Sequence, residues 1–150
     1  MKKKYLVTGG SGFIGSALVM KLLNEGHSVR VFDNNSRGNL RRLESVIDQI
    51  EFVEGDIRDL AQVEDACKDI DAVCHLAFVN GTKFFYELPE LVLEVGVKGM
   101  MNILDACIAH SIDDLILASS SEVYQSPDEV PTSENVPLIV PDLQNPRYSY

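Results

Sequence analysis

The sequence predicts an α/β protein whose doubly wound parallel sheet lies between two layers of helices, a three-layer α/β/α arrangement. Short apolar runs alternate with stretches of helical periodicity along most of the 150 residues. Several runs are apolar throughout, as expected of strands that are covered on both faces. A glycine-rich segment joins the first run to the first helical stretch. Strands that alternate with helices pair in parallel, because each helix crosses over and brings the next strand alongside.

The expected helices and strands are each predicted from the pattern of apolar residues, glycines and prolines in their own segment. Gly26 ends the first helix, because glycine readily adopts the left-handed conformation after a last turn. Pro89 begins the longest helix, in the first turn where its missing N–H is harmless. Segment 126–146 holds five of the six prolines, shows no periodicity and is expected to be a loop. The expected strands are 5–8, 29–32, 51–53, 72–76 and 114–118, and the expected helices are 13–24, 40–47, 60–67 and 89–110.

The composition is that of a single globular domain, with 45% apolar and 24% charged residues. A net charge of −10 argues against a nucleic-acid partner, because phosphate binding needs clustered Lys and Arg. No apolar run approaches the about 18 residues that a membrane span needs. Glycines interrupt the first apolar run, which argues against a signal peptide. The three cysteines match no metal-site spacing and are expected to be buried thiols in the cytoplasm.

The glycine-rich segment 8–15 lies between the first strand and the first helix. Gly10, Gly12 and Gly15 satisfy the G-x-G-x-x-G pattern of a Rossmann-type dinucleotide-binding loop, and Gly9 adds a G-x-x-G-x-x-G spacing. Glycines allow a tight turn and close approach of a pyrophosphate, and the helix N-terminus offers N–H groups to it. A Walker-type phosphate loop is excluded because Ser16 stands where its lysine would be.

Two acids follow the next two strands. Asp33 lies 18 residues beyond Gly15, where a carboxylate accepts hydrogen bonds from a ribose diol and repels a 2′-phosphate. It favours NAD over NADP. Arg37 keeps NADP open as an alternative, although it could instead face solvent or pair with an acid. Asp56 follows the third strand, where it could bind the adenine amino group or merely cap the next helix.

Five segments together resemble the extended short-chain dehydrogenase/reductase superfamily, in its nucleotide-sugar epimerase/dehydratase branch: 8–15, 33–38, 55–57, 75–77 and 118–124. The resemblance covers almost the whole chain. It implies that Asp56 and Ile57 line the adenine, and that Leu76, Ala77 and Phe78 pass under the phosphate–ribose part of NAD. The full set of cofactor-binding residues expected on this basis is Gly9, Gly12, Phe13, Ile14, Gly15, Asp33, Asn34, Ser36, Arg37, Asp56, Ile57, Leu76, Ala77, Phe78 and Ser119.

The resemblance also implies three catalytic residues. Ser120 matches the catalytic Ser/Thr of the family, and Glu122 stands where dehydratases and decarboxylases carry an acid. Tyr150 matches the tyrosine of a Tyr-x-x-x-Lys motif, with Tyr148 as a competitor. A serine run after a strand is also a common helix cap, and Glu122 could be a surface acid. His75, after an apolar strand, is expected to be structural.

The implied function is an NAD-dependent nucleotide-sugar epimerase, dehydratase or decarboxylase. The motif lysine and a substrate domain are missing, so the chain is expected to be a truncated NAD-binding domain, inactive alone and a homodimer through 89–110 when full-length. Gly96 replaces a common family Asn, and with Gly99 it is expected to allow close packing, for example at a dimer interface. A non-catalytic dinucleotide sensor and an NADP-dependent carbonyl reductase are the alternatives.

Overall fold

The computed structural model describes residues 1–140 and 142–145. Its sheet has five parallel strands in the order β3-β2-β1-β4-β5. This order confirms the doubly wound arrangement, because the chain moves outward from β1 in one direction and then returns to build in the other. The strands are β1 (Lys4–Thr8), β2 (Ser28–Asp33), β3 (Ile50–Glu54), β4 (Ala72–His75) and β5 (Asp114–Leu117).

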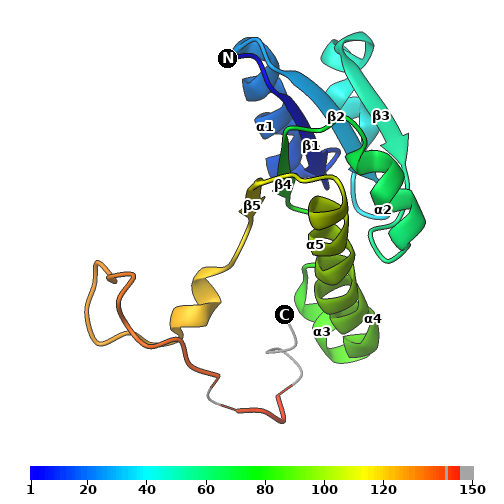
Figure 1. Ribbon diagram of the computed structural model, residues 1–150. Helices are drawn as coiled ribbons and strands as arrows, with labels where there is room; N and C mark the ends of the chain where they lie inside the picture. The colour runs from blue at the N-terminus through cyan, green and yellow to red at the C-terminus, as the bar shows by residue number, and fades with distance from the viewer. Residues whose placement is uncertain (141, 146–150) are drawn as a thin grey trace.

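Helices cover both faces of the sheet, which confirms the three layers (Figure 1). On one face lie α1 (Phe13–Asn24) and the 3-10 helix η1 (Leu40–Gln49). On the other lie α2 (Leu60–Cys67) and α5 (Gly99–Ala109). Neighbouring residues of β1 point to opposite layers, so Leu6 belongs to the core under α2 and α5 and Val7 to the core under α1.

The segment between β4 and α5 differs from the expected single helix 89–110. Helix α3 (Thr82–Glu87) precedes it and was not predicted, because a six-residue helix shows too little periodicity. The long helix itself is continuous but changes type, from α4 (Pro89–Leu93) through a π-helical turn η2 (Glu94–Lys98) to α5. Isolated π turns inside helices are frequent at functional sites, so η2 is of interest for the site described below.

The C-terminal part of the described chain leaves the sheet. After β5 the chain forms a short 3-10 helix, η3 (Ser121–Tyr124), and then runs on without a regular element among the described residues up to 145, as expected for a loop (Figure 1). Strand β5 corrects one expectation. Ile116 and Leu117 are 61% and 50% exposed, so this apolar edge strand is not covered on both faces by the described residues.

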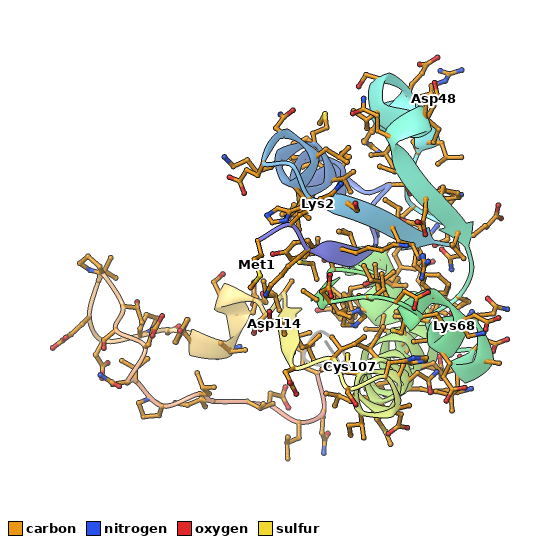
Figure 2. The ribbon with its side chains drawn as sticks, turned by 45° about the horizontal axis from the view of Figure 1, so that its top comes forward. Met1, Lys2, Asp48, Lys68, Cys107 and Asp114 are labelled. Carbon is orange, nitrogen blue, oxygen red and sulfur yellow. The ribbon has the colours of Figure 1, made fainter. Side chains whose placement is uncertain are left out.

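Three further features concern the N-terminus, the cysteines and the length of the helices. Asp114, at the start of β5, lies near Met1 and Lys2 (Figure 2), and its carboxylate accepts a hydrogen bond from Lys3 Nζ. Cys67, Cys74 and Cys107 are buried free thiols, as expected. Within the described ranges, no helix is both long and apolar enough to cross a bilayer.

Candidate dinucleotide-binding site

The glycine loop connects β1 to α1 and lies against the end of β4. Gly9 has a φ of +71°, and a Cβ atom there would lie 2.8 Å from the backbone nitrogen of Ala77. Gly15, in the first turn of α1, lies so close to the Gly9 carbonyl that a Cβ atom would overlap it. These two glycines are therefore required by backbone crowding inside the protein, in addition to any close approach of a ligand.

The N-terminus of α1 is open at the crest of the loop. Gly12 is its N-cap residue, and no side chain among the described residues caps the first turn. Phe13 and Ile14 are 84% and 69% exposed there. The first N–H groups of a helix lack partners within the helix and carry a partial positive charge. This terminus suits a phosphate group, which needs N–H donors and positive potential.

Asp33 ends β2 beside this loop, and it is only 8% exposed. Its Oδ2 accepts a hydrogen bond from the Ser11 backbone N–H at 3.0 Å, and its Oδ1 accepts one from the Asn35 N–H at 2.8 Å. Two backbone donors thus hold the carboxylate in one orientation. Each oxygen retains acceptor capacity, which fits the expected hydrogen bonds from a ribose diol.

Arg37 lies in a position that the sequence did not predict. Its guanidinium carbon lies 5.2 Å from the centroid of the Phe84 ring, on the newly found helix α3. A cation over an aromatic face is attracted by the ring quadrupole. The guanidinium therefore connects the loop after β2 to the segment after β4 across the site.

A hydroxyl that the sequence reasoning missed supports the end of β4. Thr8 Oγ1 accepts hydrogen bonds from the backbone N–H groups of Leu76 and Ala77, at 3.2 and 3.1 Å. It also lies 2.7 Å from His75 Nδ1. Burial lowers the pKa of His75 to about 4, so the imidazole is neutral near pH 7. Because Thr8 Oγ1 already accepts from two N–H groups, its hydroxyl donates the hydrogen bond to Nδ1. His75 is structural, as expected. The role of Thr8 could have been inferred from the sequence, because its hydroxyl directly precedes the glycine loop.

Asp56 is bound by a second unpredicted residue. Arg58 donates from Nε to Asp56 Oδ1 at 3.0 Å and from Nη2 to Oδ2 at 2.7 Å. The guanidinium beside it lowers the pKa of Asp56 to about 2, so the carboxylate stays ionised. The backbone N–H of Asp56 donates to Gln62 Oε1 at 3.0 Å. A basic residue two positions after a strand-end acid is a weak sequence signal, since most such pairs are simply surface charges.

A cleft joins these parts along the carboxyl edge of β1, β2, β3 and β4. Eleven of the expected cofactor-binding residues line it: Gly9, Gly12, Asp33, Asn34, Ser36, Arg37, Asp56, Ile57, Leu76, Ala77 and Phe78. Phe13, Ile14 and Gly15 do not line it but form the adjoining helix start. The lining that sequence reasoning missed is Phe32, Gly38, Gly55, Val79 and Val95.

Two of the expected catalytic residues, Ser120 and Glu122, and the expected cofactor-binding residue Ser119 do not line this cleft. All three follow β5 in the chain. Ser120 Oγ accepts a hydrogen bond from the Glu122 N–H at 3.3 Å and caps η3, which is the helix-cap role that the sequence also allowed. Tyr150 lies outside the described residues, as does its competitor Tyr148.

The cleft fits a dinucleotide. It has an uncapped helix N-terminus for the pyrophosphate, an oriented buried carboxylate at the end of β2 for one ribose, and a second ionised carboxylate after β3 for the base. The carboxyl edge of a doubly wound sheet, where the strand order reverses, is the usual binding place for such ligands. These groups match the pyrophosphate, one ribose and the base of a dinucleotide.

Comparisons with known proteins agree with this geometry. A UDP-glucose 4-epimerase from Corynebacterium glutamicum is 34% identical over 134 residues, which cover 89% of this chain and 40% of that protein. A UDP-N-acetyl-alpha-D-glucosaminuronate decarboxylase from Bacillus cytotoxicus is 36% identical over 124 residues, covering 83% and 38%. The chain thus spans about 40% of the length of these relatives, which are enzymes of nucleotide-sugar metabolism.

A solved structure shares the fold and was crystallised with the expected cofactor. The UDP-glucose 4-epimerase from Bifidobacterium longum, in complex with NAD+ and UDP, matches 90% of this chain and 42% of its own with a TM-score of 0.82 and 30% identity. A model of the NAD dependent epimerase/dehydratase family matches residues 5–150. The cleft, the relatives and this match lead to one conclusion: the chain belongs to the NAD-dependent epimerase/dehydratase family, within the extended short-chain dehydrogenase/reductase superfamily.

Proposed function

We propose that this chain is the NAD-binding part of a nucleotide-sugar epimerase, dehydratase or decarboxylase that acts by transient hydride transfer from a sugar hydroxyl carbon. One observation carries the proposal: a single cleft joins the glycine loop, the fixed carboxylate of Asp33 and the ionised carboxylate of Asp56. The 4-epimerases and the decarboxylase among the relatives support the substrate class.

The chemistry divides between cofactor and protein. Bound NAD supplies the hydride acceptor. In our proposal Tyr150 takes the hydroxyl proton as its phenolate, which the positive charges of the motif lysine and of bound NAD would favour, and Ser120 Oγ orients that hydroxyl. Glu122 moves a proton in a later elimination or decarboxylation step. Ser119 would be a further cofactor-binding residue, as the resemblance implies. The nucleotide-sugar subsite belongs to a domain that these 150 residues do not span.

Titration of the chain with NAD and with NADP tests the cofactor assignment. We expect NAD to bind at least tenfold more tightly, because Asp33 is held where a 2′-phosphate would meet its negative charge. The variant Asp33→Asn should narrow this preference, since it keeps the shape and removes the charge. At least tenfold tighter NADP binding would refute the assignment and favour the carbonyl reductase alternative.

Activity and affinity together separate an enzyme part from a sensor. We expect NAD to bind to the chain without turnover of UDP-sugars, and turnover to appear when the chain is joined to a substrate domain and the motif lysine. Transient absorbance of NADH on addition of a nucleotide-sugar is the measurement. NAD binding with no transient NADH in that longer protein would favour a non-catalytic sensor.

We further propose that the functional protein is a cytoplasmic homodimer. The long helix carries an exposed apolar stripe whose members lie three or four residues apart: Leu93, Val97, Met101, Leu104 and Ile108. Their exposed fractions run from 41% at Leu104 to 78% at Ile108. An apolar stripe at this spacing is typical of helix–helix contacts. The three buried cysteines, none of them in a disulfide, fit a reducing compartment.

A further inference from the structure

Arg58 connects two parts of the chain that lie 36 residues apart. Two of its guanidinium nitrogens bind the carboxylate of Asp56, as described above, and its Nη1 donates to Glu94 Oε2 at 3.0 Å. Asp56 lines the cleft and follows β3, whereas Glu94 begins the π-helical turn η2. The guanidinium is thus fixed from two sides, which a single surface ion pair would not achieve.

The same helical turn touches two further residues of the cleft. A Cβ atom on Gly96 would lie 2.9 Å from Phe78 Cε2, and one on Gly99 would lie 2.5 Å from Ile57 Cδ1. These glycines therefore serve close packing inside the domain, at Phe78 and Ile57, rather than the dimer contact that the sequence suggested as an example. The turn η2 and its flanking glycine support the cleft at three adjacent places.

We propose that Arg58, held by Glu94, is a positioning residue that gives this cleft its selectivity for a base with an exocyclic amino group. This inference rests on the proposed binding of a dinucleotide in the cleft. Arg58 is not among the residues that line the cleft. It fixes the direction of the one acceptor position of the Asp56 carboxylate that Arg58 does not fill itself.

The hydrogen bonds of Asp56 show where that position lies. A carboxylate has about four acceptor positions. Three are filled by Arg58, through its backbone N–H at 2.9 Å to Oδ1 and the two side-chain bonds. The fourth, on Oδ2, is taken by Asn34 Nδ2 at 3.3 Å, the longest of the four contacts. Asn34 also lines the cleft, so an amino group of a bound base can replace its amide there.

The charge of the Asp56 carboxylate explains why this geometry would distinguish a base with an amino group from one with a carbonyl oxygen. Asp56 stays ionised and so can only accept hydrogen bonds at this position. An amino group meets it as a donor, whereas a carbonyl oxygen at the same place meets another acceptor and is repelled. An acceptor held toward the cleft favours a base that offers a donor there and disfavours one that offers a second acceptor. Without Arg58 the carboxylate can rotate, and this penalty is relieved.

Binding of two dinucleotides that differ only in the base tests the inference. NAD carries adenine, and nicotinamide hypoxanthine dinucleotide carries a carbonyl oxygen in place of the amino group. Calorimetric titration of the purified 150-residue protein gives both dissociation constants. For the wild type we expect NAD to bind at least about tenfold more tightly, the effect of one hydrogen bond to a charged group.

Three variants separate positioning from general support. Arg58→Met should bring the preference for NAD below about threefold. Arg58→Lys should do nearly the same, because it keeps the charge but loses the two-pronged contact. Glu94→Gln should give an intermediate preference. Glu25→Gln, which removes the exposed Lys21–Glu25 ion pair at the C-terminal end of α1, is the matched control and should leave both affinities unchanged.

Each possible result either supports or overturns the inference. If the wild type prefers NAD by less than about threefold, or if the Arg58 variants weaken both ligands equally and keep the preference, the inference is overturned. If the wild type binds neither dinucleotide, the proposed function fails and this inference with it. Circular dichroism identifies a variant that does not fold, and Glu94→Gln then carries the test, because Glu94 is 60% exposed and can lose its charge without disturbing a core.

Discussion

Gly9 and Gly26 have similar backbone conformations, but glycine is favoured at the two positions for different reasons. Both have positive φ, of +71° and +85°. A Cβ atom on Gly9 would overlap the backbone at Ala77, whereas nothing among the described residues lies within 4 Å of one on Gly26. A side chain at either position would be strained by the positive φ. Only at Gly9 would it also clash with backbone atoms that cannot easily move.

The first prediction uses this pair. Gly26→Ala should lower the free energy of unfolding by about 1 kcal/mol, through backbone strain alone. Gly9→Ala should cost clearly more and should also weaken NAD binding, because the loop must shift away from Ala77. Urea denaturation and NAD titration measure the two effects. Equal costs for the two variants would show that the crowding at Gly9 is relieved without consequence.

His75 gives a prediction for pH. Its pKa is about 4 in the folded protein and near 6.5 when unfolded, so below pH 6.5 the unfolded state takes up a proton that the folded state does not. Stability is therefore fully present above pH 6.5 and is lost as the pH falls toward 4. The expected slope is about 1.4 kcal/mol per pH unit within this window.

Comparison with the variant His75→Asn separates the contribution of His75 to the pH dependence of the free energy of unfolding from that of the carboxylates. The variant removes the titrating group and keeps a polar atom near Thr8. Urea denaturation at pH 7.5, 6, 5 and 4.5 should show a difference between wild type and variant that changes by more than 2 kcal/mol across the series, a figure of about the size the pKa difference implies. A constant difference would mean that His75 becomes protonated in the folded state at its ordinary pKa.

At the scale of elements, the π-helical turn η2 has two faces with separate roles. Its inward side meets Phe78 and Arg58, and its outward side carries Val97, which is 56% exposed. Glycine within a helix costs about 1 kcal/mol relative to alanine. The close approach of Gly96 to the Phe78 ring is a physical reason to retain it, since a methyl group there would displace a residue of the cleft.

Gly96→Ala tests this reason. We expect the gain in helix propensity to offset most of the overlap, so the free energy of unfolding should change by less than about 1 kcal/mol. The dissociation constant for NAD should rise several-fold, because the Phe78 ring must move. Lys98→Ala, at an exposed position of the same turn, is the control and should leave NAD affinity unchanged. Unchanged affinity in Gly96→Ala would separate the turn from the cleft.

At the scale of the whole molecule, apolar surface is left over in two places. One is β5, whose Ile116 and Leu117 are exposed at the sheet edge. The other is the stripe on the long helix, which lies on the outside of the α2–α5 layer. Burial of apolar area is the main favourable term in association as in folding, so these surfaces are the places where further protein is expected to bind.

The stripe leads to a prediction about assembly. Met101 stands near its middle and is 57% exposed. Met101→Glu should shift the protein from dimer to monomer in sedimentation velocity at micromolar concentration, because a charge would be buried at the contact. Lys98→Gln, off the stripe on the same helix, should leave the dimer intact. A wild-type protein that is monomeric at 100 µM would contradict the proposed homodimer.

Local pattern was sufficient for much of this protein. The five strands, the glycine loop and Asp33 were predicted from the sequence, because periodicity, tight turns and strand ends depend on residues close together in the chain. The strand ends shifted by a residue, as at Leu76, and η1 is a 3-10 helix where a short helix was expected. The cofactor cleft was largely predictable too, since parallel strands bring their carboxyl ends to one edge.

Contacts between distant residues account for the rest. Arg37 meets Phe84, and Arg58 meets Glu94, across separations of 47 and 36 residues that no local pattern encodes. The same holds for Gly96 and Gly99, whose neighbours are identified only when the helix packs on the cleft. The doubly wound fold and its NAD-type loop can thus be predicted from the sequence, because both depend on the backbone conformations of residues close together in the chain. The orientation of the side chains that give the cleft its selectivity depends on packing, because it is set by which elements lie side by side.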